Sequence, residues 1–177
     1  MKKIVLTFSL LAVVCGLTAA TTPRVSRTSL RAMEKSIDGR LSELWTDVPY
    51  LVIGPTRGVY LEGYGAVFTA ELNLVANPAS LMHANVDKGD VTRTRQKKME
   101  RIPLLKKALR DALVSTAASL DTVPNEEQVT IVAFIDHYPW EDVTGMPAQV
   151  MVQAVKGKLL EAQRTGTTEA VIKVTEN

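Results

Sequence analysis

The sequence predicts an α+β fold: a single domain with a mostly antiparallel sheet, two long helices and one short helix. Two long segments repeat apolar residues every three or four positions, which is typical of amphipathic helices. Shorter segments alternate apolar and polar residues, or are continuously apolar, which is typical of strands. The resulting order is α-β-β-α-β-β-α-β. Each long helix precedes two strands that can pair with each other, so we expect the helices on one face of the sheet.

The first helix is predicted over residues 28–46, with Ser26 or Thr28 as the N-cap and Pro49 beyond its end. Its inward face is formed by apolar residues at helical spacing, namely Leu30, Met33, Ile37, Leu41 and Leu44. A short apolar strand at 51–53 should follow, because Gly54 and Pro55 interrupt the chain directly after it.

A hairpin is predicted from segments 58–61 and 66–75, which flank the glycine-rich connection Glu62-Gly63-Tyr64-Gly65. The second segment alternates, with one apolar face made of Ala66, Phe68, Ala70, Leu72 and Leu74. Its other face carries Thr69, Glu71 and Asn73, so this strand should be half-buried. Residues 76–90 lack periodicity and are expected to form a loop.

The second long helix should begin after a cap at Asp90 or Thr92 and extend to Leu120. Its apolar stripe consists of Met99, Ile102, Leu105, Leu109, Leu113, Thr116 and Leu120. Pro103 interrupts this pattern, so it either kinks one long helix or marks the first turn of a shorter helix that begins near Ile102.

The C-terminal third should contain three strands and a short helix. Segment 129–135 is apolar on both faces, as expected of a central strand that is covered on both sides. Segment 150–154 alternates as a second strand, 156–164 forms a short helix that ends near Gly166, and 170–174 forms a last strand.

The first twenty residues have the three parts of a cleavable secretory signal: Lys2 and Lys3, an apolar run over 4–17, and the small residues Thr18-Ala19-Ala20. The run of about 14 residues is shorter than the roughly 20 that a spanning helix needs. We therefore expect residues 1–20 to be removed, 21–27 to form a flexible lead-in, and 28–177 to form the domain. A lipid anchor on Cys15 is the less favoured reading, because Val14 is bulky for the residue before an acylated cysteine.

The predicted mature chain is therefore exported to the periplasm or the cell exterior, contains no cysteine and has no transmembrane segment. It carries 19 basic and 19 acidic residues, because Lys2 and Lys3 leave with the signal. Zero net charge gives no argument for nucleic acid as a partner.

The charges are nevertheless segregated along the chain. Residues 88–110 contain nine basic and two acidic residues, whereas 121–142 contain six acidic and no basic ones. Opposite blocks suggest pairing, within one molecule or between copies. The candidate exposed contacts of the basic segment are Lys97, Lys98, Arg101 and Arg110. Their partner would be an anionic envelope surface or a second copy of the chain. Nucleic acid is not expected, because no aromatic residues are interleaved with the charges.

The densest polar cluster, Asp136 to Asp142, directly follows the predicted central strand. Asp136, His137 and Glu141 are candidates for acid–base work or for holding a divalent metal. The plainer interpretation, which we favour, is a polar turn with Tyr138 and Trp140 packed against the sheet.

A second unusual stretch contains four glycines between residues 54 and 65, and a ligand rim there would expose Arg57 and Tyr64. Two tight turns bordering a hairpin explain the same glycines.

No established nucleophile, phosphate-loop or zinc motif is present, so the sequence predicts no metal and no cofactor. The function that it favours is an exported, non-enzymatic binding or interaction module. The alternative is a small metal-dependent or acid–base hydrolase centred on Asp136, His137 and Glu141.

Overall fold

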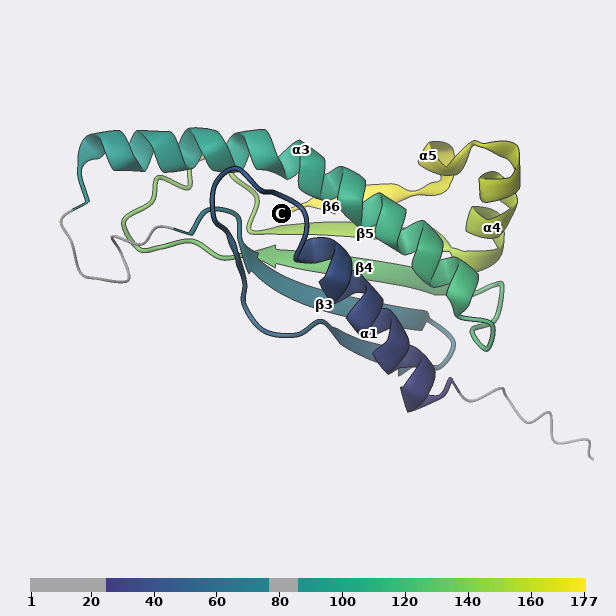
Figure 1. Cartoon of the computed structure of the whole chain (residues 1–177). Helices are drawn as coiled ribbons and strands as arrows, with labels where there is room; N and C mark the ends of the chain where they lie inside the picture. The colour runs from purple at the N-terminus through teal and green to yellow at the C-terminus, as the bar shows by residue number, and fades with distance from the viewer. Residues whose placement is uncertain (1–24, 77–85) are drawn as a thin grey trace, which may run out of the picture.

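The computed structural model describes residues 25–76 and 86–177, which form an α+β fold with a mixed, mostly antiparallel sheet (Figure 1). The elements in chain order are α1 (Arg27–Leu41), β1 (Leu51–Val52), β2 (Arg57–Leu61), β3 (Gly65–Asn73), α3 (Lys88–Ser119), β4 (Gln128–Ile135), β5 (Gln149–Val155), α4 (Lys156–Thr165), α5 (Thr168–Val171) and β6 (Lys173–Glu176). The predicted fold class and approximate order of elements are therefore confirmed.

The sheet has the order β1-β3-β4-β5-β6, and β2 pairs with the same edge of β3 as β1 does. The β2–β3 and β4–β5 pairs are antiparallel neighbours in sequence, as expected. In contrast, β3 and β4 run parallel, from Gly65 opposite Gln128 to Leu72 opposite Ile135. A parallel pair needs a long crossover connection, and α3 forms most of it.

Helices α1 and α3 lie on one face of the sheet (Figure 1). The strands direct alternate apolar side chains toward these helices, and Phe68, Leu72 and Ile131 are fully buried there. From the helix side, Ile37 and Leu109 complete the same core. The alternating apolar side chains of residues 66–74 therefore pack against the apolar stripe of residues 102–113, as the sequence predicts.

Helix α3 begins at Lys88, two residues before the nearer of the two predicted caps, and continues through Pro103. Asp87 is the N-cap and accepts a hydrogen bond from the backbone N–H of Asp90, whose side chain accepts one from the Asp87 N–H. This reciprocal capping box corrects the predicted caps at Asp90 or Thr92. Of the two expectations for Pro103, the structure has the long helix.

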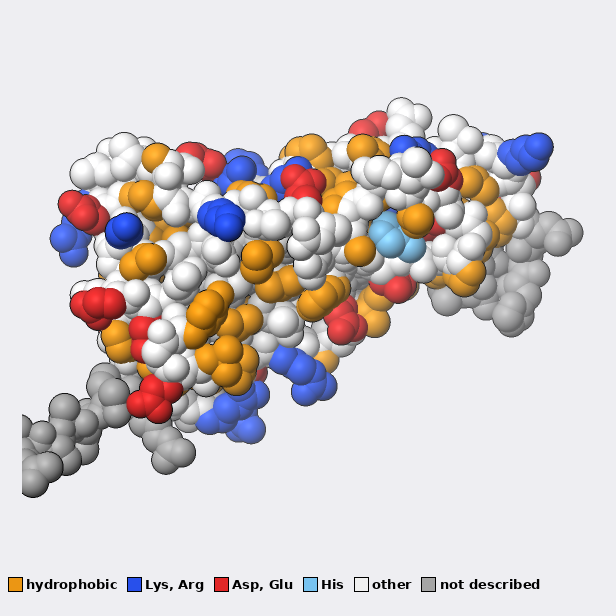
Figure 2. All heavy atoms as spheres, turned by 180° about the vertical axis from the view of Figure 1, so that it is seen from behind, with side chains coloured by type: hydrophobic (Ala, Val, Ile, Leu, Met, Phe, Trp, Pro, Cys, Tyr) orange, Lys and Arg blue, Asp and Glu red, His pale blue; other side chains and the backbone are white. Residues whose placement is uncertain are grey.

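The opposite face of the sheet carries the alternate side chains that point away from α1 and α3; we call it the open face. On it, Val59, Leu61 and Phe134 remain 48%, 47% and 40% exposed. Seen from behind, hydrophobic side chains gather in patches between polar ones (Figure 2). The expectation that β4 is covered on both sides is therefore wrong: β4 is central in the sheet, but its Phe134 side has no covering layer in the described chain.

Two further boundaries differ from the prediction. Helix α1 ends at Leu41 rather than near residue 46, and Ser42 caps it with hydrogen bonds back to the last turn. The predicted strand 170–174 is instead the helical turn α5 followed by β6. Within the described ranges, no helix combines the length and the apolar character needed to cross a membrane.

Candidate functional site

The polar cluster after β4 is built around a buried ion pair that joins two distant parts of the chain. The Lys98 ammonium lies 2.6 Å from a carboxylate oxygen of Glu141, and the two side chains are 0% and 2% exposed. Lys98 also donates to the backbone carbonyl of Asp136 over 2.9 Å. The backbone N–H of Tyr138 donates to Glu141 over 3.1 Å. The loop that begins at Asp136 is thereby fixed to α3.

His137 lies at the rim of this pair, with its side chain 16% exposed. Its Nδ1 atom is 3.2 Å from a Glu141 oxygen and 3.3 Å from the Lys98 nitrogen. A protonated Nδ1 donates to the Glu141 carboxylate, whereas an unprotonated Nδ1 accepts from the Lys98 ammonium, so His137 makes one of these hydrogen bonds at a time. Asp136 is exposed and contributes only its backbone carbonyl, so the structure does not unite the three predicted side chains.

The arrangement resembles a structural clamp more than a reactive centre. Burial lowers the pKa of Lys98, and the adjacent Glu141 carboxylate opposes this shift. The ammonium occupies the space between Glu141 and His137 that a metal ion bound to both would need. Among the described residues, no three His, Cys, Asp or Glu side chains are grouped to hold a metal ion. His83, the other histidine, lies outside the described residues.

One turn further along α3, Arg101 forms a second clamp. Its side chain is 1% exposed and donates to Asp47 over 2.6 Å, to the carbonyl of Val48 over 2.5 Å, and to the carbonyl of Leu74. The guanidinium carbon lies 4.8 Å from the centre of the Trp45 ring, within the range of a cation–π contact. Arg101 thus ties the chain before β1 and the end of β3 to the same helix.

Asp47 is shared by both basic neighbours on α3. Lys97 lies 2.6 Å from it, with its side chain 31% exposed. Hydrogen bonds from Lys97, from the Val48 N–H and from Arg101 hold the pKa of Asp47 well below its ordinary value. The same contact raises the pKa of Lys97.

The prediction that Lys98 and Arg101 are exposed is wrong. Both lie on the helix side that continues through Leu105 and Leu109 into the core, and polar loops rather than strands face them there. The basic segment as a whole is paired within its own chain. Eight of its nine basic side chains lie within ion-pair distance of a carboxylate: Arg93, Arg95, Lys97, Lys98, Arg101, Lys106, Lys107 and Arg110.

Two of these pairs join the basic to the acidic block, namely Lys98 with Glu141 and Arg95 with Asp142. Of the four candidate contacts, Lys97 and Arg110 keep partly exposed side chains, and Arg110 pairs with Glu169 over 3.3 Å. Contact of this helix with an anionic surface or with a second copy stays a prediction.

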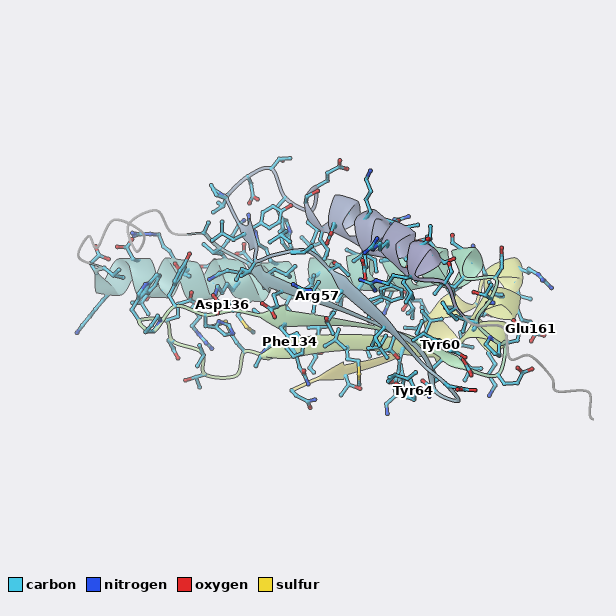
Figure 3. The ribbon with its side chains drawn as sticks, turned by 90° about the horizontal axis from the view of Figure 1, so that it is seen from below. Arg57, Tyr60, Tyr64, Phe134, Asp136 and Glu161 are labelled. Atoms are coloured by element: carbon cyan, nitrogen blue, oxygen red, sulfur yellow. The ribbon has the colours of Figure 1, made fainter. Side chains whose placement is uncertain are left out.

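The glycine-rich stretch places Arg57 and Tyr64 on the open face. Arg57 is opposite Thr69 in the β2–β3 ladder, and Thr69 belongs to the outward-facing set of β3. Tyr64 crosses from the hairpin turn to β4, where its hydroxyl lies 3.2 Å from the Thr130 hydroxyl. Arg57, Tyr64 and Phe134 are spread along the sheet (Figure 3).

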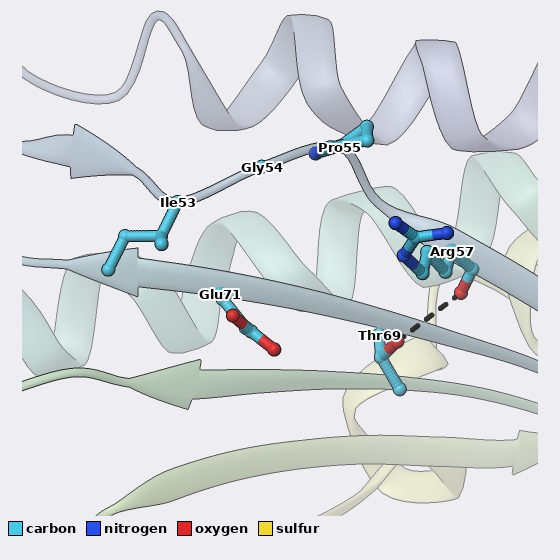
Figure 4. A pocket seen from close by; sticks show the side chains of 6 residues that line it. All are labelled: Ile53, Gly54, Pro55, Arg57, Thr69 and Glu71. Atoms are coloured by element: carbon cyan, nitrogen blue, oxygen red, sulfur yellow. Dashed lines mark hydrogen bonds between the residues drawn. The ribbon is translucent and has the colours of Figure 1, made fainter.

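Arg57 also lines a pocket of about 190 Å³ where the edge of the sheet is interrupted. Strands β1 and β2 both pair with β3, and the chain between them bows outward at Gly54, whose φ is +101°. The pocket is lined by Ile53, Gly54, Pro55, Arg57, Thr69 and Glu71 (Figure 4). Thr69 donates weakly to the Arg57 carbonyl, over 3.5 Å. Within the described chain, neither the Arg57 nor the Glu71 side chain forms an ion pair.

Sequence reasoning identified Arg57 but not Glu71, Thr69 or Ile53. The alternation of β3 assigns Thr69 and Glu71 correctly to the face away from the helices. It carries no information about the gap between β1 and β2, which creates the pocket. No sequence signal pointed to that gap beyond the Gly54-Pro55 pair.

The pocket and the clamps are thus two polar features that the fold builds from distant segments. No protein-family model matches this chain, and no curated protein and no solved structure matches it.

Proposed function

We propose that this protein is an exported, non-enzymatic binding module whose ligand site is the edge pocket on the open face of the sheet. The observation that carries the proposal is a pocket lined by two opposite charges, Arg57 and Glu71, neither of which forms an ion pair within the described chain. Among the described residues, most basic side chains of α3 are used in internal ion pairs. Arg57 and Glu71 form no ion pair there and line one pocket together, which suits an external partner.

The chemistry of the lining favours binding over catalysis. Arginine stays protonated at all physiological pH values, so Arg57 holds an anionic group but does not exchange protons. Thr69 and Glu71 add a hydroxyl and a carboxylate, and none of the six lining residues is His, Cys, Lys or Ser. The chain's described histidine, His137, lies in the Lys98–Glu141 cluster instead.

Binding is best tested by mapping small ligands onto the backbone amides. The ¹⁵N-labelled protein is titrated with a panel of single compounds, including acetate, methylammonium, glucose and L-leucine, and amide shifts are followed by NMR. The proposal expects at least one compound to shift the amides of residues 53–57 and 69–71 together. A panel that leaves these amides unchanged, or that shifts only the His137 loop, contradicts it.

Export is supported by the charged start, the apolar run and the small residues up to Ala20. These residues lie outside the described part of the chain. N-terminal sequencing of the protein recovered from its native cells is expected to give Thr21 as the first residue. An intact Met1, or a lipid on Cys15, would contradict the proposed processing.

A further inference from the structure

The pocket sits within a regular grid of side chains on the open face. The ladders align Ile53, Glu71 and Phe134 in one row, because the Ile53 N–H donates to the Glu71 carbonyl and Glu71 is opposite Phe134. The neighbouring row contains Arg57 and Thr69. Side chains two residues apart on one strand lie on the same face of a sheet. Arg57 and Glu71 therefore stand on the same side, in adjacent rows, with Thr69 between them.

The two charges share one pocket but do not form an ion pair with each other. Both side chains are exposed and line the same pocket, and their charged atoms are not within the 4.0 Å of an ion pair. A guanidinium binds a carboxylate through two parallel hydrogen bonds, and a carboxylate binds an ammonium group. A molecule that carries both an anionic and a cationic group can therefore contact both side chains in this pocket.

Apolar side chains flank the acidic end of the pocket. Ile53, which directly follows β1 and lines the pocket, is 41% exposed, and Phe134 on β4 is 40% exposed. They stand on either side of Glu71 in its row. Exposed apolar surface beside placed polar groups is typical of sites that bind a partly apolar ligand. The volume of about 190 Å³ is below the roughly 300–1,000 Å³ of pockets that hold drug-sized molecules. The ligand is therefore small.

We infer that the pocket binds a free α-amino acid with an apolar side chain. Its carboxylate pairs with Arg57, its ammonium group pairs with Glu71, and its side chain rests on Ile53 and Phe134. This inference rests on the proposed binding function and names the ligand class of the same site.

The test compares L-leucine with three relatives that each lack one feature. Leucinamide lacks the carboxylate, N-acetyl-L-leucine lacks the ammonium group, and glycine lacks the apolar side chain. Contacts to exposed charges are weak, so the titrations extend to about 10 mM. We expect L-leucine to shift the amides of residues 53–57 and 69–71. Each relative should bind at least about fivefold more weakly.

Variants assign the contacts. Arg57→Gln and Glu71→Gln should each weaken L-leucine binding about fivefold or more. The matched controls Arg31→Gln and Glu43→Gln change exposed residues away from the pocket and should leave L-leucine binding unchanged. Because all four residues are exposed, we expect the variants to fold, which urea denaturation verifies.

Three results would overturn the inference: no L-leucine shift at these amides, equal binding of the amide or N-acetyl derivative, or binding indifferent to both pocket variants. If another panel compound shifts the pocket amides while L-leucine does not, the binding function stands and the amino-acid assignment fails. If no compound shifts them, both proposals fail.

Discussion

Replacing Lys98 with methionine tests whether the Lys98–Glu141 pair is a structural clamp. Methionine keeps most of the aliphatic stem but leaves the Glu141 carboxylate, 2% exposed, without its ammonium partner. Breaking a buried ion pair by removing one partner costs about 3–5 kcal/mol, because the remaining charge is uncompensated. Glu141 would retain the Tyr138 N–H. We therefore expect the lower end, a loss of about 3 kcal/mol in the free energy of unfolding.

The assay is urea denaturation followed by far-UV circular dichroism, with thermal melts alongside. In a chain of this size, about 1 kcal/mol corresponds to roughly 2–4 °C, so Tm should fall by about 6–12 °C. Lys107→Met is the matched control on the same helix. Lys107 and its partner Asp111 are 73% and 57% exposed, so its loss should cost about 0–0.5 kcal/mol.

A double-mutant cycle separates the pair from the packing of each side chain. Glu141→Gln combined with Lys98→Met leaves no unpaired charge, so the double variant should lose at least about 1 kcal/mol less than the sum of the single losses. A Lys98→Met variant as stable as Lys107→Met, or strictly additive single losses, would refute the clamp.

Three further predictions follow from the same structure. Pairing holds the pKa of Asp47 below its usual value of about 3.9, so the stability it adds is present at neutral pH and is lost as the pH falls below about 4. Asp47→Asn should therefore flatten the decline of the urea midpoint between about pH 5 and pH 3, and an unchanged decline would count against this contact. Gly65→Ala should destabilise by at least about 2 kcal/mol, because its φ is +129° and a Cβ would lie 1.9 Å from the Gln128 carbonyl oxygen. The control Gly39→Ala meets nothing within 4 Å and should stabilise α1 by about 0.5–1 kcal/mol, so equal urea midpoints for the two variants would be inconsistent with this geometry. Leu109→Asp should cost about 3–5 kcal/mol, since Leu109 is 0% exposed, and a wild-type urea midpoint would remove Leu109 from the core.

The layer structure could be predicted because periodicity reports directly which face of an element is buried. Leu105 and Leu109 on α3, and Phe68 and Leu72 on β3, were assigned to the core from spacing alone. Spacing does not report neighbours, so nothing in the sequence showed that β3 and β4 pair in parallel. Nor does spacing show that Phe134 has no covering layer within the described residues, because an apolar strand face has the same sequence pattern whether it is covered or open.

The predicted exposure of Lys98 and Arg101 is wrong because a charged side chain can be buried where polar partners surround it. Their positions lie on the buried side of α3 together with Leu105, and this spacing was the available signal. What could not be predicted is that carbonyls of Asp136, Val48 and Leu74 would converge there as partners. The order of α5 and β6 was missed for a related reason. Ala170, Ile172 and Val174 alternate like a strand, yet the first of them lies in a helical turn.

The parallel seam between β3 and β4 has a consequence for the order of folding. The hairpins β2–β3 and β4–β5 join segments that are near in sequence, and the backbone hydrogen bonds of α3 are local. The seam instead joins Gly65 to Gln128 and Leu72 to Ile135, on either side of the whole helix. Bringing distant segments together costs loop-closure entropy before their contacts compensate for it, so non-local strand pairs form slowly. We therefore expect the two halves of the sheet to form first, and the pairing of β3 with β4 at the centre of the sheet to limit the rate of folding.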